Sequence, residues 1–508
     1  MKSVYSNAFI IYLVVFSIFL VPTFFYNYTF SDEGTHLLLS VFYKDLISNI
    51  PKIGLSYSNL YDFSINYLVH YPKLQIAYPP VYHLTNAFVF FLSSPSIVVA
   101  RMVNLIYALL AFSVFYILLK KHFNEKTAFI STIFFSLSSY SLLYASRAFQ
   151  DFSAYFSILL SILFFSKAFE KESKRYWLLA GISVSLAILS KQVSGILLIF
   201  FIVYIFSRKD LQLKKKINNL VILILPVIIF ITPYLLLLNS VGGLEINKIV
   251  AISYAAQQGE PTNPLSPGFW LYFLIEPTVF APLTLVFFLS LVFYIYKKEK
   301  FWKEFLIFSL IFYISLSIIP NKELRFSQLF LLPAYVSLSF YLAKIKNSKI
   351  IYSILTLYSI TSILVFYPTI QGYPQEKVSN TILQNLPEGA SVALFSDDEP
   401  LFSSSIISDI ATKGKNKTAV IIRSCAFGNK TKEEILKTLD ESNAYYIIYS
   451  AWSQDKTIDK IKDSLTLESS VSQNNLTTEI YRYKNFQNKK PERACNYICL
   501  TGEKICEK

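Results

Sequence analysis

Apolar runs of about 17 to 25 residues recur along the first three-quarters of the chain, and they limit its fold more than any other feature. A run of this length crosses a hydrocarbon layer of about 30 Å when it forms a helix. Only 16% of the 508 residues are charged, compared with about 25% in ordinary soluble domains. The chain is therefore expected to be a multi-pass membrane protein whose spanning region is all-α and ends at residue 368.

Basic clusters between the apolar runs predict the topology, because cytoplasmic loops of membrane proteins are enriched in Lys and Arg. This distribution also accounts for the net charge of +14 without a nucleic-acid partner. Lys2 places the N-terminus in the cytoplasm. The later clusters lie at 120–126, 167–175, 208–216, 297–303 and 344–349. About eleven spanning helices bring every cluster to that side of the membrane. They are expected at 8–26, 98–119, 127–145, 152–168, 176–190, 193–207, 218–238, 269–296, 303–319, 327–343 and 349–368.

The topology depends on how three apolar stretches are interpreted. Residues 176–207 are basic at both flanks, so the chain must turn back within them, and Lys191 and Gln192 mark the expected outer turn. Residues 81–92 are too few to span, and we expect them to form a helix along the outer surface. The first run, 8–26, lacks the small-residue cleavage pattern of a signal peptide and is expected to remain as a helix.

The tail from 369 to 508 is more polar and is expected to form a small α/β domain outside the membrane. Strand-like runs occur at 391–395, 418–423 and 444–449, and residues 432–439 have helical periodicity. The predicted domains are therefore 1–368, with surface helices in a long first outer loop (27–97), and 369–508.

Sequons and cysteines agree with an outer position of the tail. N-x-Ser/Thr sequons, a pattern common by chance, begin at Asn27, Asn416, Asn429 and Asn475. The cysteines are Cys425, Cys495, Cys499 and Cys506. They predict disulfides of undetermined pairing in an oxidising exterior. A metal site built on Cys495 and Cys499 is the alternative, although no histidine follows nearby.

Ionisable residues gather at the predicted outer helix ends, where membrane proteins rarely place charge without a use. The first are Asp32 and Glu33, just after the first helix. Either carboxylate can take a proton from a hydroxyl or help to hold a metal. The alternative is that Asp32 only caps a helix that starts near Thr35.

Further charges lie before three later apolar runs. Asp151 can be only a helix N-cap, with Arg147 as its ion-pair partner four residues away, and Lys191 can simply extend its ammonium to the surface. Lys322 and Arg325 run against the loop-charge trend, because they lie in a predicted outer loop.

Together, carboxylates from two loops and cations from three others would line one cavity beside the membrane. Such a cavity suits a sugar linked to a polyprenyl phosphate. Glycosyl transfer needs a base for the incoming hydroxyl and positive charge for the phosphate that departs.

The order of these motifs resembles that of the GT-C glycosyltransferases, in the branch of the protein O-mannosyltransferases and the lipid A aminoarabinose transferase. The resemblance covers residues 1–368. It rests on Asp32-Glu33, Tyr78-Pro79-Pro80-Val81-Tyr82, Arg147 with Asp151, Ala180-Gly181 through Lys191, and Lys322–Phe326 followed by Leu332-Pro333.

The resemblance implies a polyprenyl- or dolichyl-phosphate sugar donor and inversion at the anomeric carbon. It makes Asp32 the catalytic base, with Glu33 beside it, and puts Asp151 near the donor phosphate or a bound cation. The substrate-binding residues that it implies are Arg147, Lys191, Lys322, Arg325, Tyr82 and His83.

A divalent metal is compatible with this resemblance but is not required by it. Pro79-Pro80 stands where the aminoarabinose branch carries a Glu-Lys pair. Metal ligands would therefore have to come from Asp151, His36 or His83.

The expected function is a glycosyltransferase of the cell membrane that acts at the outer face on an acceptor protein, lipid or glycan. The alternative is a transporter or flippase for a lipid-linked glycan, which would place charges near the bilayer midplane and break helices in paired halves. A receptor or scaffold that displays residues 369–508 would leave Asp32, Asp151 and Lys191 unexplained.

Overall fold

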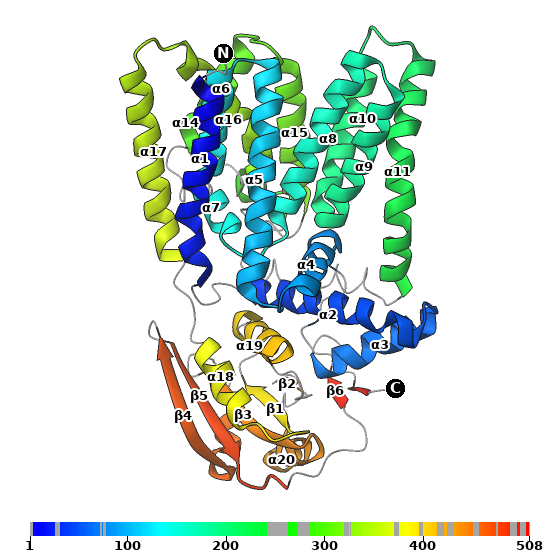
Figure 1. The fold of residues 1–508 in the computed structure, drawn as a ribbon, viewed down its shortest axis with the longest axis vertical. Coiled ribbons are helices and arrows are strands. Elements are labelled where there is room, and N and C mark those ends of the chain that lie inside the picture. Colours follow the sequence, from blue (N-terminus) through cyan, green and yellow to red (C-terminus); the bar gives the residue numbers. More distant parts are fainter. Residues whose placement is uncertain are drawn as a thin grey trace. The chain divides into compact units, whose positions relative to one another are not determined.

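The computed structural model describes residues 4–25, 31–71, 74, 78–240, 263–272, 284–319, 325, 327–369, 375–395, 400–413, 421–423, 430–450, 457–473, 476–487, 495–497 and 504–506. Several predicted positions lie outside these residues, namely Asn27, Asn416, Asn429, Asn475, Lys322, Cys425 and Cys499. The chain forms two compact units (Figure 1). We name them the helical unit (Met1–Pro22, Ile76–Tyr82 and Met102–Thr369) and the mixed unit (Thr23–Gln75, His83–Arg101 and Ile370–Lys508).

The helical unit consists mainly of long helices that stand side by side (Figure 1). They are α1 (Val4–Leu20), α5 (Ile97–His122), α6 (Glu125–Ser136), α7 (Ser139–Ala145), α8 (Asp151–Lys171), α9 (Lys174–Ser190), α10 (Ile196–Ser207), α11 (Leu213–Ser240), α14 (Thr284–Tyr296), α15 (Trp302–Ile318), α16 (Ser327–Lys344) and α17 (Ser348–Thr369). Each predicted span overlaps one or two of them. Among the described residues, five helices are long and apolar enough to cross a membrane, or six if the bent pair α6–α7 counts as one. The all-α membrane region is confirmed, and the total number of spans stays a prediction.

The prediction of a single helix over 127–145 is wrong. Helices α6 and α7 meet at an angle of 68°. The side chain of Asn124 caps α6 by accepting from the Thr127 amide at 2.8 Å, and Ser138 caps α7 by accepting from the Ser141 amide at 3.2 Å. A second N-cap within the apolar run therefore starts a new helix in a new direction.

The predicted turn at Lys191 is confirmed. Helix α9 ends at Ser190, and a short 3-10 helix (η2, Gln192–Gly195) leads into α10. Near the C-terminus of α8, Phe165 packs against Trp177, from the start of α9, and stacks on Phe201 of α10 with ring centroids 3.9 Å apart. The start of α9 and the middle of α10 thus contact the same ring, so the chain reverses at Lys191.

The predicted cytoplasmic clusters meet at one end of the helical unit. Their loops are joined by ion pairs and by lysines that donate to backbone carbonyls. These contacts are Lys121–Glu170 (2.6 Å), Lys215–Glu172 (2.8 Å), Lys344–Glu299 (3.2 Å), Lys300 to His122 O (2.6 Å) and Lys126 to Ile345 O (2.9 Å). Exposed pairs of this kind add little stability, but they show that all five basic loops adjoin. We name this end the basic end.

Helix α8 separates the basic end from the predicted outer residues. It runs from Asp151 to Lys171, 21 residues, which is about 30 Å at 1.5 Å per residue. Asp151 and the basic loop at Lys171 therefore lie at opposite ends of a helix that is long enough to span a membrane.

Gly181 brings α9 close to α11. A Cβ atom at this position would lie 2.2 Å from the carbonyl oxygen of Leu223. Only the absence of a side chain permits this approach, as is common where membrane helices pack tightly.

The mixed unit is built on a five-stranded sheet with the order β2-β1-β3-β5-β4. Its strands are β1 (Ser391–Phe395), β2 (Ile421–Arg423), β3 (Ala444–Ser450), β4 (Leu465–Gln473) and β5 (Leu476–Tyr483). Strand β1 is parallel to β2 and β3 and is buried throughout, as expected for a central parallel strand. Its helices are α18 (Gln375–Asn385), α19 (Pro400–Lys413) and α20 (Lys432–Glu441). The predicted α/β character of the tail is confirmed.

Helices of the first outer loop belong to the same unit as this sheet. They are α2 (Ser31–Ile53), α3 (Tyr57–His70) and most of α4 (Val81–Leu92). Helix α2 packs on α19, and Val69 of α3 is buried in one core with Ile435 and Tyr481. The hairpin of β6 (Cys495–Tyr497) and β7 (Lys504–Cys506) also contacts α3.

The cysteine chemistry of the tail favours disulfides over a metal site. Cys495 is disulfide-bonded, and the described part of the chain contains no free cysteine. A sulfur in a disulfide is not available as a thiolate ligand.

Candidate active site

Asp151, Lys191 and Arg325 form a buried ionic group in the helical unit. The Lys191 ammonium donates to Oδ1 of Asp151, and Nη1 of Arg325 lies 3.7 Å from Oδ2. The three side chains are 10%, 1% and 11% exposed, in the order Lys191, Asp151, Arg325. Two cations share one carboxylate, so the group carries a formal charge of +1. We name it the DKR group.

Local structure explains how two members of the DKR group reach this point. Asp151 is the first residue of α8, and Lys191 is the residue at which α9 ends and the chain turns. Gln150, not Asp151, occupies the N-cap position, and it makes no side-chain cap hydrogen bond. The interpretation of Asp151 as a mere N-cap is therefore wrong. The N-terminus of α8 adds a partial positive charge to the group.

Aromatic rings hold the third member, Arg325. Its guanidinium lies over the rings of Tyr144 and Phe149, at 5.5 and 5.4 Å from their centroids. The Tyr155 hydroxyl donates to the backbone carbonyl of Arg325 at 2.9 Å. A guanidinium on aromatic faces keeps its charge while its position is fixed.

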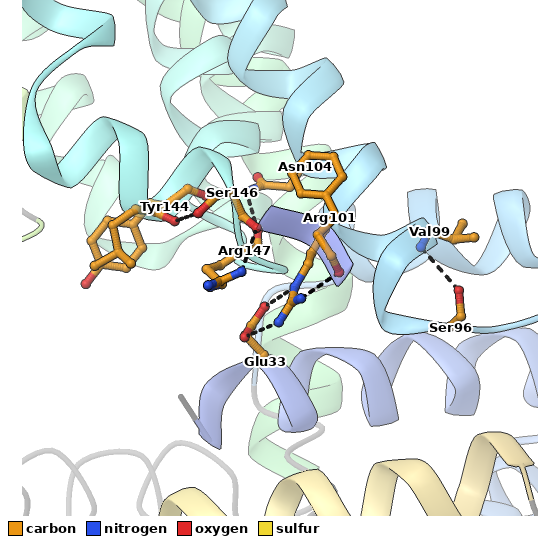
Figure 2. A network of polar contacts seen from close by, with 10 residues as sticks. Glu33, Ser96, Val99, Arg101, Asn104, Tyr144, Ser146 and Arg147 are labelled. Carbon is orange, nitrogen blue, oxygen red and sulfur yellow. Dashed lines mark hydrogen bonds and ion pairs between the residues drawn. The ribbon is translucent and has the colours of Figure 1, made fainter. Parts of the chain in front are cut away.

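Asn104 is a site residue that the sequence reasoning missed. It is fully buried on α5, and its Nδ2 donates to the backbone carbonyls of Tyr144 and Arg147, the latter at 2.6 Å (Figure 2). Asn104 thereby holds the turn that carries the Tyr144 ring beneath Arg325. Arg147 belongs to the same turn and is itself buried.

In the mixed unit, the two adjacent carboxylates have different surroundings. Glu33 is 0% exposed, and both of its oxygens accept from Arg101, at 2.8 Å from Nε and 2.9 Å from Nη2 (Figure 2). Asp32 is half-buried in the first turn of α2. That helix begins at Ser31 rather than near Thr35, so the alternative in which Asp32 precedes and caps it is wrong.

The candidate metal ligands are only partly brought together. Nδ1 of His36 and Nε2 of His83 are 2.9 Å apart, and both rings are buried. Two imidazoles supply part of a typical ligand set, but no group of three His, Cys, Asp or Glu side chains that could hold a metal occurs among the described residues. Asp151 lies between two cations, which suits a neighbouring anion better than a metal ion.

Tyr82 and His83, the predicted substrate residues of the surface helix, are both fully buried in α4. The structure thus brings Asp151, Lys191 and Arg325 together, and it joins Glu33 to Arg101 and His36 to His83. The signal for Arg101 and Asn104 was their position as polar residues within the apolar run 98–119.

A protein-family model and solved structures show what the chain is similar to. The model of the dolichyl-phosphate-mannose-protein mannosyltransferases matches residues 77–236, a segment that contains Asp151 and Lys191. No curated protein sequence matches the sequence of this chain.

Two solved proteins have the same fold. ArnT from Cupriavidus metallidurans bound to undecaprenyl phosphate superposes with a TM-score of 0.63 at 12% identity, over 94% of this chain and 98% of that chain. AglB, the archaeal oligosaccharyltransferase from Archaeoglobus fulgidus, in complex with an inhibitory peptide and a dolichol-phosphate, gives 0.54 at 12% identity, over 94% and 74%. The fold expected from the resemblance is confirmed, and the chain is a multi-pass membrane protein with the fold that ArnT and AglB share.

Proposed function

We propose that the chain is a glycosyltransferase that uses a polyprenyl- or dolichyl-phosphate sugar as donor and a hydroxyl as acceptor. The observation that carries the proposal is the DKR group, in which two buried cations share one carboxylate at a helix N-terminus. Such a group attracts an anion. Structures with this fold hold undecaprenyl phosphate in ArnT and a dolichol-phosphate in AglB.

In the proposed reaction, a carboxylate takes the proton of the acceptor hydroxyl as its oxygen attacks the anomeric carbon. The bond from that carbon to the phosphate oxygen breaks, and its electron pair stays on the phosphate. A phosphodiester with one negative charge becomes a monoester that approaches two at pH 7. Lys191 and Arg325 would stabilise the additional charge as it forms, and an interaction that strengthens toward the transition state accelerates the reaction. A single displacement inverts the anomeric centre.

We assign the base to Asp32 rather than Glu33. Both oxygens of Glu33 accept from Arg101 in a fully buried pair, so this carboxylate cannot reach a substrate. Asp32 is half-buried, and Arg101 holds its sequence neighbour Glu33 in place. A base must lie within hydrogen-bond reach of the proton that it removes, and of the two only Asp32 has exposed surface.

We place the reaction on the outer side of the cell membrane. The basic end belongs in the cytoplasm by the positive-inside rule, and α8 puts the DKR group about 30 Å from it. The disulfide at Cys495 supports an oxidising compartment for the mixed unit.

The alternative of a lipid-linked glycan transporter gains some support from the bent pair α6–α7. Transporters of this kind usually break corresponding helices in two halves of the fold, with charges near the midplane. Among the described helices only one such pair is bent, and the DKR group lies at the end of α8. The enzyme is therefore the better interpretation.

The test uses the purified full-length protein in lipid nanodiscs. Dolichyl-phosphate mannose and undecaprenyl-phosphate aminoarabinose are supplied with a membrane extract as the acceptor source, and release of lipid phosphate is measured. We expect release with at least one donor, and loss of release in Asp32→Asn. Binding of undecaprenyl phosphate is measured in the same preparations, and equal affinity in the wild type, Lys191→Met and Arg325→Met would contradict the proposal.

A further inference from the structure

Arg101 is fully buried near the start of α5 and holds two segments of the mixed unit at once. Its Nε and Nη2 donate to the two oxygens of Glu33 (Figure 2). Its Nη1 donates to the backbone carbonyl of Phe24 at 2.8 Å. Phe24 precedes residues 26–30 and Glu33 follows them. One guanidinium therefore links Phe24 to Glu33, which lies in the first turn of α2.

A buried ion pair is by itself weak evidence for a stabilising role. Moving two charges out of water costs as much as their attraction returns unless the geometry is excellent, and apolar replacements of buried pairs are often neutral or stabilising. A planar guanidinium instead supplies orientation. Its bidentate contact fixes both the distance and the plane of the carboxylate.

Holding Glu33 also sets the direction of Asp32, because successive residues of a helix point about 100° apart. The hydrogen-bonded His36–His83 pair restrains the same part of α2 from α4. His36 lies four residues after Asp32, on the same face of the helix. The first turns of α2 cannot rotate without breaking one of these two buried contacts.

We infer that Arg101 is a positioning residue, which through Glu33 aims the Asp32 carboxylate at the acceptor hydroxyl. This inference rests on the proposed function. In this scheme Arg101 touches neither donor nor acceptor, and the DKR group holds the donor phosphate. Loss of the Arg101–Glu33 pair should therefore lower kcat and leave the KM for the donor unchanged.

The test compares the full-length wild type with the double variant Arg101→Met/Glu33→Leu in nanodiscs. The double variant removes both charges together, so no unpaired charge stays buried. It also frees the carbonyl of Phe24, so its Tm is expected to fall modestly while the protein stays folded. We expect kcat for donor consumption to fall about 10²-fold, because small misplacements of a reacting group have effects of this size. The KM for the donor should stay within about threefold of the wild-type value. Lys44→Met is the matched control, because it removes another ion pair of α2 (Lys44–Asp45, 3.7 Å) and should leave kcat unchanged.

A folded double variant with the kcat of the wild type would overturn the inference. If the double variant does not fold, Arg101→Lys provides the second test, since lysine keeps the charge but lacks the bidentate fork. Its kcat should fall at least about tenfold at unchanged KM, and a wild-type kcat would overturn the inference.

Asp32→Asn is measured beside these variants to separate the two proposals. Full activity of Asp32→Asn would refute the assigned base and this inference with it. An inactive Asp32→Asn together with a fully active Arg101→Lys would refute the positioning role of Arg101 alone.

Discussion

Replacing Lys191 by methionine tests the charge stabilisation that the DKR group is proposed to provide. The substitution keeps the length of the side chain and removes its ammonium, while Asp151 retains Arg325 at 3.7 Å. A unit negative charge that forms about 4 Å from an ammonium interacts with it by about 4 kcal/mol at an effective dielectric constant of about 20. The Lys191 ammonium also interacts with the Asp151 carboxylate, and this interaction offsets part of that energy. We expect a loss of about 3 kcal/mol, which is roughly 10²-fold in kcat and agrees with the effect of removing one oxyanion donor.

The assay follows release of lipid phosphate by Lys191→Met, Lys191→Arg and the wild type, with the Tm of each protein measured in the same nanodiscs. Lys191→Arg keeps the charge and should lose less than about tenfold. Lys126→Met is the matched control, because Lys126 binds the carbonyls of Ala343 and Ile345 at the basic end and should affect Tm but not kcat. A folded Lys191→Met protein with a kcat within about threefold of the wild type would refute the assigned role.

Three further outcomes are expected. Asn104→Ala frees the carbonyls of Tyr144 and Arg147, so it should lower stability by about 1–3 kcal/mol and raise the KM for the donor; an unchanged KM would show that this turn does not organise the DKR group. Gly181→Ala forces a Cβ against the Leu223 carbonyl and should cost about 1–3 kcal/mol of stability, measured as a drop in Tm relative to Gly195→Ala, whose Cβ would meet only Ile188 at 4.0 Å. Cysteine placed at the exposed Lys209 of the basic end should react with an impermeant maleimide only after permeabilisation, and labelling of intact cells would reverse the proposed orientation.

Much of the helical unit could be predicted because its determinants are local. Apolar length and loop charge place the helices without knowledge of their neighbours, and two basic flanks require the reversal at Lys191. The bend within 127–145 was missed because hydropathy does not distinguish a continuous helix from one that Ser138 restarts. In the tail, the periodicity at 432–439 identified α20, whose N-terminus is fixed by a capping box of Thr431 and Glu434.

The pairing of charges was less predictable because it depends on tertiary structure. For Asp151, the spacing of four residues offered Arg147 only as an alternative ion-pair partner, and that helical argument does not apply because α8 begins only at Asp151. Its partner Lys191 lies 40 residues away, and Glu33 and Arg101 are 68 residues apart. Pairs this distant follow from how helices pack, which no local pattern in one sequence specifies.

The most direct test of the central claim is an experimental structure of the protein in nanodiscs with undecaprenyl phosphate bound. The account predicts a phosphate with oxygens about 3 Å from the Lys191 ammonium and the Arg325 guanidinium, as in charge-assisted hydrogen bonds. A phosphate bound elsewhere, with Asp151 still closed on both cations, would contradict it.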